Sequence, residues 1–180
     1  MYGVKTLIVI DMQKDFIDGS LGTPEAVAIL PKVRAKIAAY RNAGHEVIFT
    51  RDTHGPDYME TSEGKYLPVV HCVRGTAGWN IPEELDVPEC EHIDKPSFGW
   101  TNWDAVVTDG AAVPRKPFEE IELVGVCTDI CVVSNALILK AMYPEVPVTV
   151  DASCCAGVTP EKHEAALEVM RSCQINVIGE

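Results

Sequence analysis

The sequence predicts an α/β fold in which a mainly parallel sheet is flanked by helices, and three observations support this. Apolar runs of strand length alternate with helical patterns along the chain. Strands joined by helices in this way form parallel sheets with right-handed crossovers. The chain has 180 residues and no visible linker, so we expect residues 1–180 to form a single domain.

The first helices and strands are predicted from their residue types and from the residues that begin or end them. Residues 5–10 are rich in β-branched apolar side chains, typical of a strand covered on both faces by helices. Thr23 and Pro24 predict the N-cap and first residue of a helix that runs to residue 42. A second strand covers residues 45–50. Residues 51–81 are rich in Gly, Pro, Asp, Thr and His without a sustained period, which predicts a functional loop.

The middle elements continue the alternation. A short extended piece at residues 92–95 precedes a helix at about 101–109 and a clear strand at 121–126. The next helix begins near Asp129 and is stopped by Pro144. The last elements are then a strand at residues 146–151, a helix from Thr159 or Pro160 to about Ser172, and a strand at residues 175–179.

Composition excludes several classes of partner. The formal charge of −12, with no Lys/Arg-rich stretch, argues against nucleic acid. No apolar stretch approaches the roughly 18 residues that a membrane span needs, and the N-terminus lacks a signal-peptide pattern. Seven cysteines in no paired spacing indicate reduced thiols rather than a disulfide framework. We therefore expect a cytoplasmic protein with no membrane partner.

Polar residues follow three of the predicted strands directly. These residues are Asp11, the segment 51–54 and the segment 127–131. Ligands of open parallel sheets bind beyond the carboxyl ends of the strands. The three segments together predict one site at this edge of the sheet.

Cys131 is the candidate nucleophile of that site. It lies in the first turn of a predicted helix, where free N–H groups and the helix dipole favour a thiolate. Asp11 is the candidate proton carrier, because attack on a carbonyl needs a base that later acts as an acid. Lys95 is expected to stabilise the ionised forms of both. The alternatives are a structural cysteine, a turn aspartate and a surface lysine.

Asp52, His54 and His71 are candidate metal ligands. Asp52 and His54 stand two residues apart on an extended segment and so project from the same side. A carboxylate and two imidazoles suit a divalent transition metal such as zinc. The alternative is a set of hydrogen-bonding loop residues without a metal.

Several ordered motifs resemble the isochorismatase-like cysteine hydrolases, and among them the nicotinamidase branch. The resemblance spans nearly the whole chain and rests on LIVIDMQKDFIDGSL, RDTH, HCVRGTAGW, KPSF, GVCTDICV and VTVDASCCAGVTPEKHEAAL. It implies a three-layer fold with a six-stranded sheet of order 3-2-1-4-5-6. It also implies a catalytic triad of Asp11, Lys95 and Cys131.

The resemblance implies further details of the site. It implies a cis peptide bond between Val126 and Cys127, and an oxyanion hole formed by the backbone N–H groups of Cys127 and Cys131. It supports Asp52, His54 and His71 as ligands of zinc, with manganese or iron as other choices. It places Phe16 in the substrate pocket.

The implied activity is hydrolysis of nicotinamide to nicotinate and ammonia through a thioester, by a homo-oligomeric enzyme. One departure concerns the wall of the pocket. The family usually carries an aromatic residue with proline shortly before the third metal ligand, whereas this chain has Tyr-Leu-Pro-Val-Val at residues 66–70. Two alternatives stay open: a hydrolase of the same family acting on a carbamoyl, ureido or isochorismate-type substrate, and a catalytically silent binding module.

Overall fold

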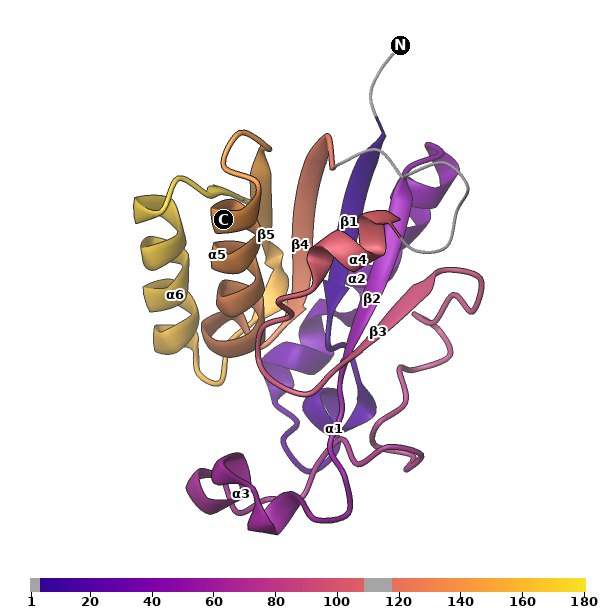
Figure 1. The fold of residues 1–180 in the computed structure, drawn as a ribbon, viewed down its shortest axis with the longest axis vertical. Helices are drawn as coiled ribbons and strands as arrows, with labels where there is room; N and C mark the ends of the chain where they lie inside the picture. Colours follow the sequence, from indigo (N-terminus) through magenta and orange to yellow (C-terminus); the bar gives the residue numbers. More distant parts are fainter. Residues whose placement is uncertain (1–3, 109–117) are drawn as a thin grey trace.

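A six-stranded sheet forms the centre of the computed structural model, which describes residues 4–108 and 118–180 (Figure 1). The strand order is β3-β2-β1-β4-β5-β6, and every neighbouring pair is parallel. The strands are β1 (Lys5–Ile10), β2 (Glu46–Asp52), β3 (Glu91–Lys95), β4 (Glu120–Val126), β5 (Val148–Ala156) and β6 (Asn176–Ile178). The predicted α/β fold and the strand order implied by the resemblance are confirmed.

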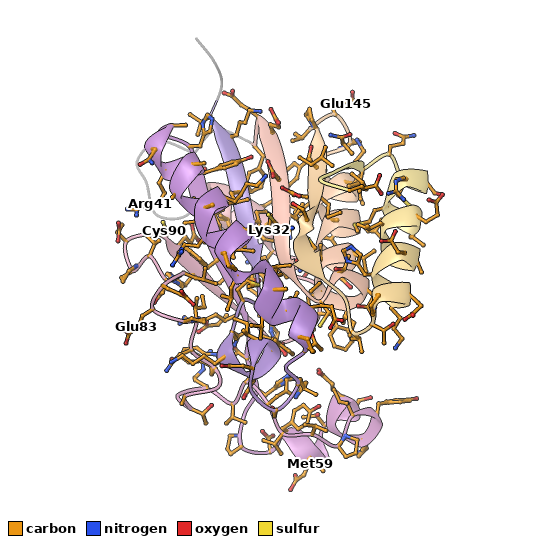
Figure 2. The ribbon with its side chains drawn as sticks, turned by 180° about the vertical axis from the view of Figure 1, so that it is seen from behind. Lys32, Arg41, Met59, Glu83, Cys90 and Glu145 are labelled. Carbon is orange, nitrogen blue, oxygen red and sulfur yellow. The ribbon has the colours of Figure 1, made fainter. Side chains whose placement is uncertain are left out.

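Helices cover both faces of this sheet and complete three layers. The helices are α1 (Lys14–Ile17), α2 (Pro24–Asn42), α3 (Ser62–Tyr66), α4 (Trp103–Thr108), α5 (Val133–Met142) and α6 (Pro160–Ser172). The rear view shows α2 crossing one face (Figure 2), and α1 packs into the same core cluster. The other face packs against α4, α5 and α6. No helix in the described parts of the chain is long and apolar enough to span a bilayer.

The sequence-based boundaries are close to the observed ones, with a few differences. The short helices α1 and α3 and the 3₁₀ turn Tyr58–Glu60 were not predicted, because each is too short to show a helical period. Strand β5 continues five residues beyond the predicted end at Asp151, because its last residues pair with the end of β4. The helix expected at 101–109 is α4, and Asp109 lies outside the described residues.

The helix predicted from Asp129 begins with a different geometry. Residues Thr128–Val132 form a π-helical turn, and α5 follows at Val133. Such turns are rare and occur often at functional sites. Cys131 lies within this turn, at the carboxyl end of β4.

The central strands approach each other closely where they leave the sheet. Gly125 has φ +119°, and a Cβ atom there would lie 2.1 Å from the carbonyl oxygen of Ile10. Only glycine fits this position. Asp11, the residue that directly follows β1, has φ +47°, an uncommon backbone conformation for a residue with a side chain.

Candidate active site

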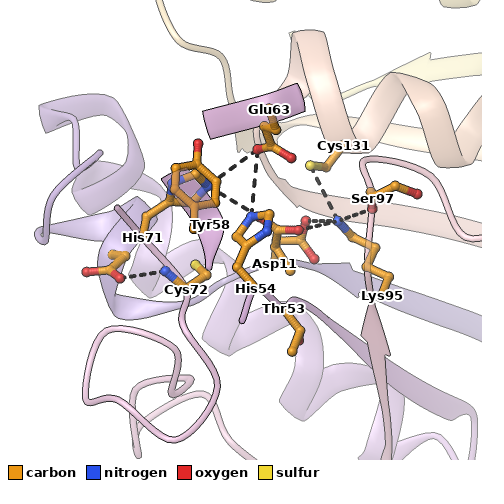
Figure 3. Close-up of polar contacts among 12 residues, drawn as sticks. Asp11, Thr53, His54, Tyr58, Glu63, His71, Cys72, Lys95, Ser97 and Cys131 are labelled. Atoms are coloured by element: carbon orange, nitrogen blue, oxygen red, sulfur yellow. Dashed lines mark hydrogen bonds and ion pairs between the residues drawn. The ribbon is translucent and has the colours of Figure 1, made fainter. Parts of the chain in front are cut away.

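Asp11, Lys95 and Cys131 meet at the carboxyl edge of the sheet (Figure 3). The Lys95 ammonium Nζ lies 2.6 Å from Asp11 Oδ2 and 3.5 Å from Cys131 Sγ. It also donates a hydrogen bond to the Ser97 carbonyl oxygen at 3.1 Å. A sulfur, a carboxylate and an ammonium from three distant parts of the chain therefore form one cluster.

Each member of this cluster is held by neighbouring structure. Thr50 Oγ1 donates a hydrogen bond to Asp11 Oδ1 at 2.6 Å and accepts one from the Asp11 backbone N–H at 3.2 Å. Lys95 ends strand β3 and is fully buried. Asn135 Nδ2 donates to the Cys131 carbonyl oxygen at 2.8 Å, which ties the π-helical turn to α5.

Burial governs the proton affinity of the Cys131 thiol. Burial raises its pKa well above the usual value, the nearby Asp11 raises it further, and Lys95 only partly opposes them. Burial thus opposes the thiolate that the start of the helix was expected to favour.

The two partners of Cys131 have shifted pKa values. Burial raises the pKa of Asp11, although Lys95 opposes the shift. Burial lowers the pKa of Lys95, but Asp11 and the other negative groups outweigh it and hold the pKa above its usual value. Lys95 is thus a fixed cation, and Asp11 is a carboxyl group with raised basicity, as proton transfer in both directions requires.

A second cluster of polar side chains lies beside the first. Asp52, His54, Glu63 and His71 each offer a ligand atom, and these atoms all lie within 4.8 Å of one another. His54 Nε2 and His71 Nε2 lie 2.9 and 3.5 Å from Asp52 Oδ2, and 3.7 and 3.6 Å from Glu63 Oε1. The three residues singled out in the sequence are thus brought together, and Glu63 of α3 joins them.

The chemistry of this cluster fits a divalent metal. Asp52 Oδ1 is buried and has no hydrogen-bond partner in the described parts of the chain. The His71 Nδ1 atom lies 2.8 Å from the Val69 carbonyl oxygen, a contact that makes Nδ1 the donor and frees Nε2 as a ligand. Burial raises the pKa of Asp52, but His54 and His71 outweigh it and hold the pKa below its usual value, so the carboxylate is ionised. One or two carboxylates with two imidazoles suit zinc, manganese or iron.

Gln13 connects the two clusters. Its side-chain amide donates to the Asp52 carbonyl oxygen at 2.8 Å and accepts from the Asp52 N–H at 2.7 Å. The same amide nitrogen donates to the Trp79 carbonyl oxygen. Because Gln13 lies two residues after Asp11, it sets the position of the Asp52 backbone relative to the first cluster.

Both clusters open into one cavity of about 590 Å³. Asp52, Glu63, His71 and Cys131 line it, and so do Phe16 and Cys127. Phe16 therefore lines the same cavity as Cys131, and its contact with a substrate stays a prediction. The peptide bond between Val126 and Cys127 is cis, as the resemblance implied.

The turn that carries Cys131 also contacts α6 and the segment just before it. Thr128 Oγ1 and His163 Nδ1 lie 2.7 Å apart, and Asp129 Oδ1 accepts a hydrogen bond from the Val158 N–H. Burial lowers the pKa of His163, so its ring is neutral at pH 7. His163 therefore contacts the π-helical turn that carries Cys131, through Thr128.

Sequence reasoning missed Glu63, Gln13 and Thr50. Glu63 stands in the loop expected to carry function, and its acidic side chain was a usable signal. Gln13 follows the end of β1, and Thr50 lies near the end of β2, at the sheet edge that binds ligands. Nothing in the local pattern says which partners their side chains meet.

Comparisons with known proteins bear on the fold and the family of the chain. The nicotinamidase/pyrazinamidase of Mycobacterium tuberculosis is 26% identical over 185 residues, covering 97% of this chain and 98% of that protein. The nicotinamidase of Saccharomyces cerevisiae is 24% identical, covering 97% and 99%. The crystal structure of the pyrazinamidase of Pyrococcus horikoshii in complex with zinc superposes with a TM-score of 0.80 at 29% identity, covering 99% of this chain and all of that one. The isochorismatase domain model matches residues 5–179, and the chain belongs to the isochorismatase family.

Proposed function

We propose that this protein is an amidohydrolase that converts a primary carboxamide, of which nicotinamide is the leading candidate, to a carboxylate and ammonia. The observation that carries the proposal is the position of the Lys95 ammonium between the Asp11 carboxyl group and the Cys131 sulfur. The names of the curated relatives support a nicotinamide-like substrate. Residues 1–180 are proposed to act as one domain.

The first half of the reaction forms a thioester. Asp11 accepts the proton of the Cys131 thiol, and the sulfur attacks the carbonyl carbon and forms the C–S bond. The backbone N–H groups of Cys127 and Cys131 are proposed to stabilise the oxyanion. The C–N bond then breaks, and the leaving nitrogen takes the proton from Asp11 and departs as ammonia.

The second half releases the acid. Water attacks the thioester carbon, and Asp11 accepts a proton from that water. The C–S bond breaks, and the sulfur leaves as a thiolate that recovers the proton held by Asp11. Lys95 stays charged throughout and stabilises the negative charge that moves between oxygen and sulfur.

Asp52, His54, His71 and Glu63 would hold a divalent metal in the same cavity. Such a metal supplies a binding point for a ring nitrogen and so orients the substrate carbonyl. Phe16 contributes an apolar wall beside His71, with ring centroids 5.4 Å apart. The role of these side chains is to position the substrate.

Ammonia release from nicotinamide tests the proposal directly. Purified protein loaded with zinc should release ammonia, and Cys131→Ala should abolish release while leaving the circular dichroism spectrum unchanged. Cys173→Ala, at an exposed cysteine, is the matched control and should keep full activity. Mass spectrometry of the quenched reaction should show an acyl group on Cys131. Turnover by Cys131→Ala would remove the assignment of the nucleophile.

The runner-up is a family member with a carbamoyl, ureido or isochorismate-type substrate. Its activity would not need a ring nitrogen bound to metal. Turnover of such substrates by chelator-treated protein, with none of nicotinamide, would select it. A silent binding module would release no ammonia from any of these substrates and would show no acyl group on Cys131 by mass spectrometry.

A further inference from the structure

The cavity beside Cys131 has two chemically different parts. Its polar part holds the Cys131 sulfur and the side chains of Asp52, Glu63 and His71. Much of the remaining wall is apolar and includes Leu21, Leu67, Phe98 and Val158. Thr23, Ser62 and Lys162 add polar groups to that wall. An apolar space thus continues directly from the candidate nucleophile.

Several large side chains of this wall are exposed to solvent, and three of them are wholly apolar. Leu67 is 37% exposed, Phe98 is 44% exposed and Val158 is 39% exposed. They come from three separate segments, which follow α3, β3 and β5 respectively. Single exposed apolar residues are ordinary on protein surfaces, but their convergence on one cavity marks a binding surface.

The cavity is large for a one-ring amide. Its volume of about 590 Å³ equals the share of roughly 20 water molecules in the liquid, at about 30 Å³ each. A pyridine ring with one carboxamide group displaces only a minority of that water. The apolar side chains around the rest of the cavity would then stay in contact with water and would contribute no binding free energy.

We propose that the site also accepts primary carboxamides whose acyl group is longer than one ring, with the apolar part extending from Cys131 toward Leu67, Phe98 and Val158. The substrate class is a primary carboxamide with an extended aliphatic or aryl-alkyl acyl group. This inference rests on the proposed amide hydrolysis. It adds that the apolar wall, as well as the metal cluster, selects the substrate.

A series of straight-chain primary amides tests the length preference. Ammonia release is measured for acetamide, butanamide, hexanamide, octanamide and nicotinamide with zinc-loaded protein. The value of kcat/KM should rise roughly fourfold for each methylene group that becomes buried, until the chain fills the cavity. Turnover of nicotinamide with a flat or falling series overturns this inference alone. No ammonia from any amide overturns the proposed function and this inference with it.

Side-chain variants identify the surface that does the selecting. Leu67→Ser and Phe98→Ser should each lower the ratio of kcat/KM for octanamide to that for acetamide by at least fivefold. Val169→Ser removes an apolar side chain that is 49% exposed on α6 and does not line the cavity, so it should leave the ratio unchanged. If the first two variants change the subunit number in light scattering and leave the ratio intact, the surface is an interface between copies of the chain and the inference fails.

Discussion

The Gln13 side chain makes two hydrogen bonds to the backbone of Asp52, one to its carbonyl oxygen and one from its N–H. This pair of bonds fixes the end of β2 against the end of β1. The cluster of Asp11, Lys95 and Cys131 and the candidate metal cluster are therefore connected through Gln13. The first prediction concerns this connection.

Replacing Gln13 with Leu should destabilise the protein and weaken metal binding together. The variant leaves two buried backbone groups of Asp52 without partners, at about 1–3 kcal/mol each. We expect the free energy of unfolding in urea to fall by about 3 kcal/mol, and zinc affinity to fall by roughly 10-fold or more. Gln174→Leu, at an exposed position, should change neither quantity. Unchanged stability of Gln13→Leu would show that water replaces the amide.

Thr50→Val should lower the turnover number with little effect on folding. The substitution keeps the shape of the side chain but removes the hydrogen bond to Asp11 Oδ1. Hydrogen bonds to charged groups contribute about 1.5–3 kcal/mol, so kcat for amide hydrolysis should fall roughly 10- to 100-fold. Thr6→Val is the control, since Thr6 is also buried on a central strand but bonds to Glu46, away from the site. Equal kcat values for the two variants would contradict the role given to Thr50.

Glu63→Gln should weaken metal binding selectively. The neutral amide is a poorer ligand than a carboxylate, and Glu63 Oε1 lies within 4 Å of both candidate histidine ligands. We expect zinc affinity, measured by competition with a chromophoric chelator, to fall at least about 10-fold. Glu60→Gln changes an exposed carboxylate on the neighbouring turn and should bind zinc as the parent protein does. Parent-like affinity in Glu63→Gln would remove Glu63 from the ligand set.

Lys36 should stabilise the protein in a pH-dependent way. Lys36 belongs to α2, and its ammonium lies 2.5 Å from Glu122 Oε1 and 2.6 Å from Asp151 Oδ2. Burial raises the pKa of Asp151, but Lys36 and Ser153 outweigh it and hold the pKa below the usual 3.8. A carboxylate with a lowered folded-state pKa contributes stability above its unfolded pKa and loses it as pH falls through the folded value.

Lys36→Met should therefore cost most at neutral pH. We expect a loss of about 2–3 kcal/mol at pH 7, below the range for fully buried pairs because the Lys36 side chain is 21% exposed. The difference from the parent protein should shrink as pH falls below the unfolded-state pKa of Asp151, about 4, and through its lower folded-state pKa. Urea unfolding at pH 7 and pH 3 measures it, with Lys32→Met on the exposed face of α2 as the control. A difference independent of pH would mean that packing, and not charge, explains the loss.

Much of the fold follows from local sequence patterns. Thr23 and Pro24 start α2 as expected, and the Thr23 hydroxyl accepts a hydrogen bond from the Ala26 N–H. The helices α1 and α3 escaped prediction because short helices are held by tertiary contacts rather than by their own period. The expected homo-oligomer and cytoplasmic location stay predictions.

The sequence by itself determined which residues end the parallel strands, and hence that Asp11, Asp52 and Cys131 share one edge of the sheet. Only the tertiary structure decided what these residues meet: Glu63 beside the histidines, Thr50 against Asp11, and a fully buried Lys95 between acid and thiol. The reason is that strand direction is encoded locally, whereas proton affinity depends on burial and on charges a few ångströms away. The Cys131 thiol shows this most clearly, because its position followed from the sequence and its raised pKa did not.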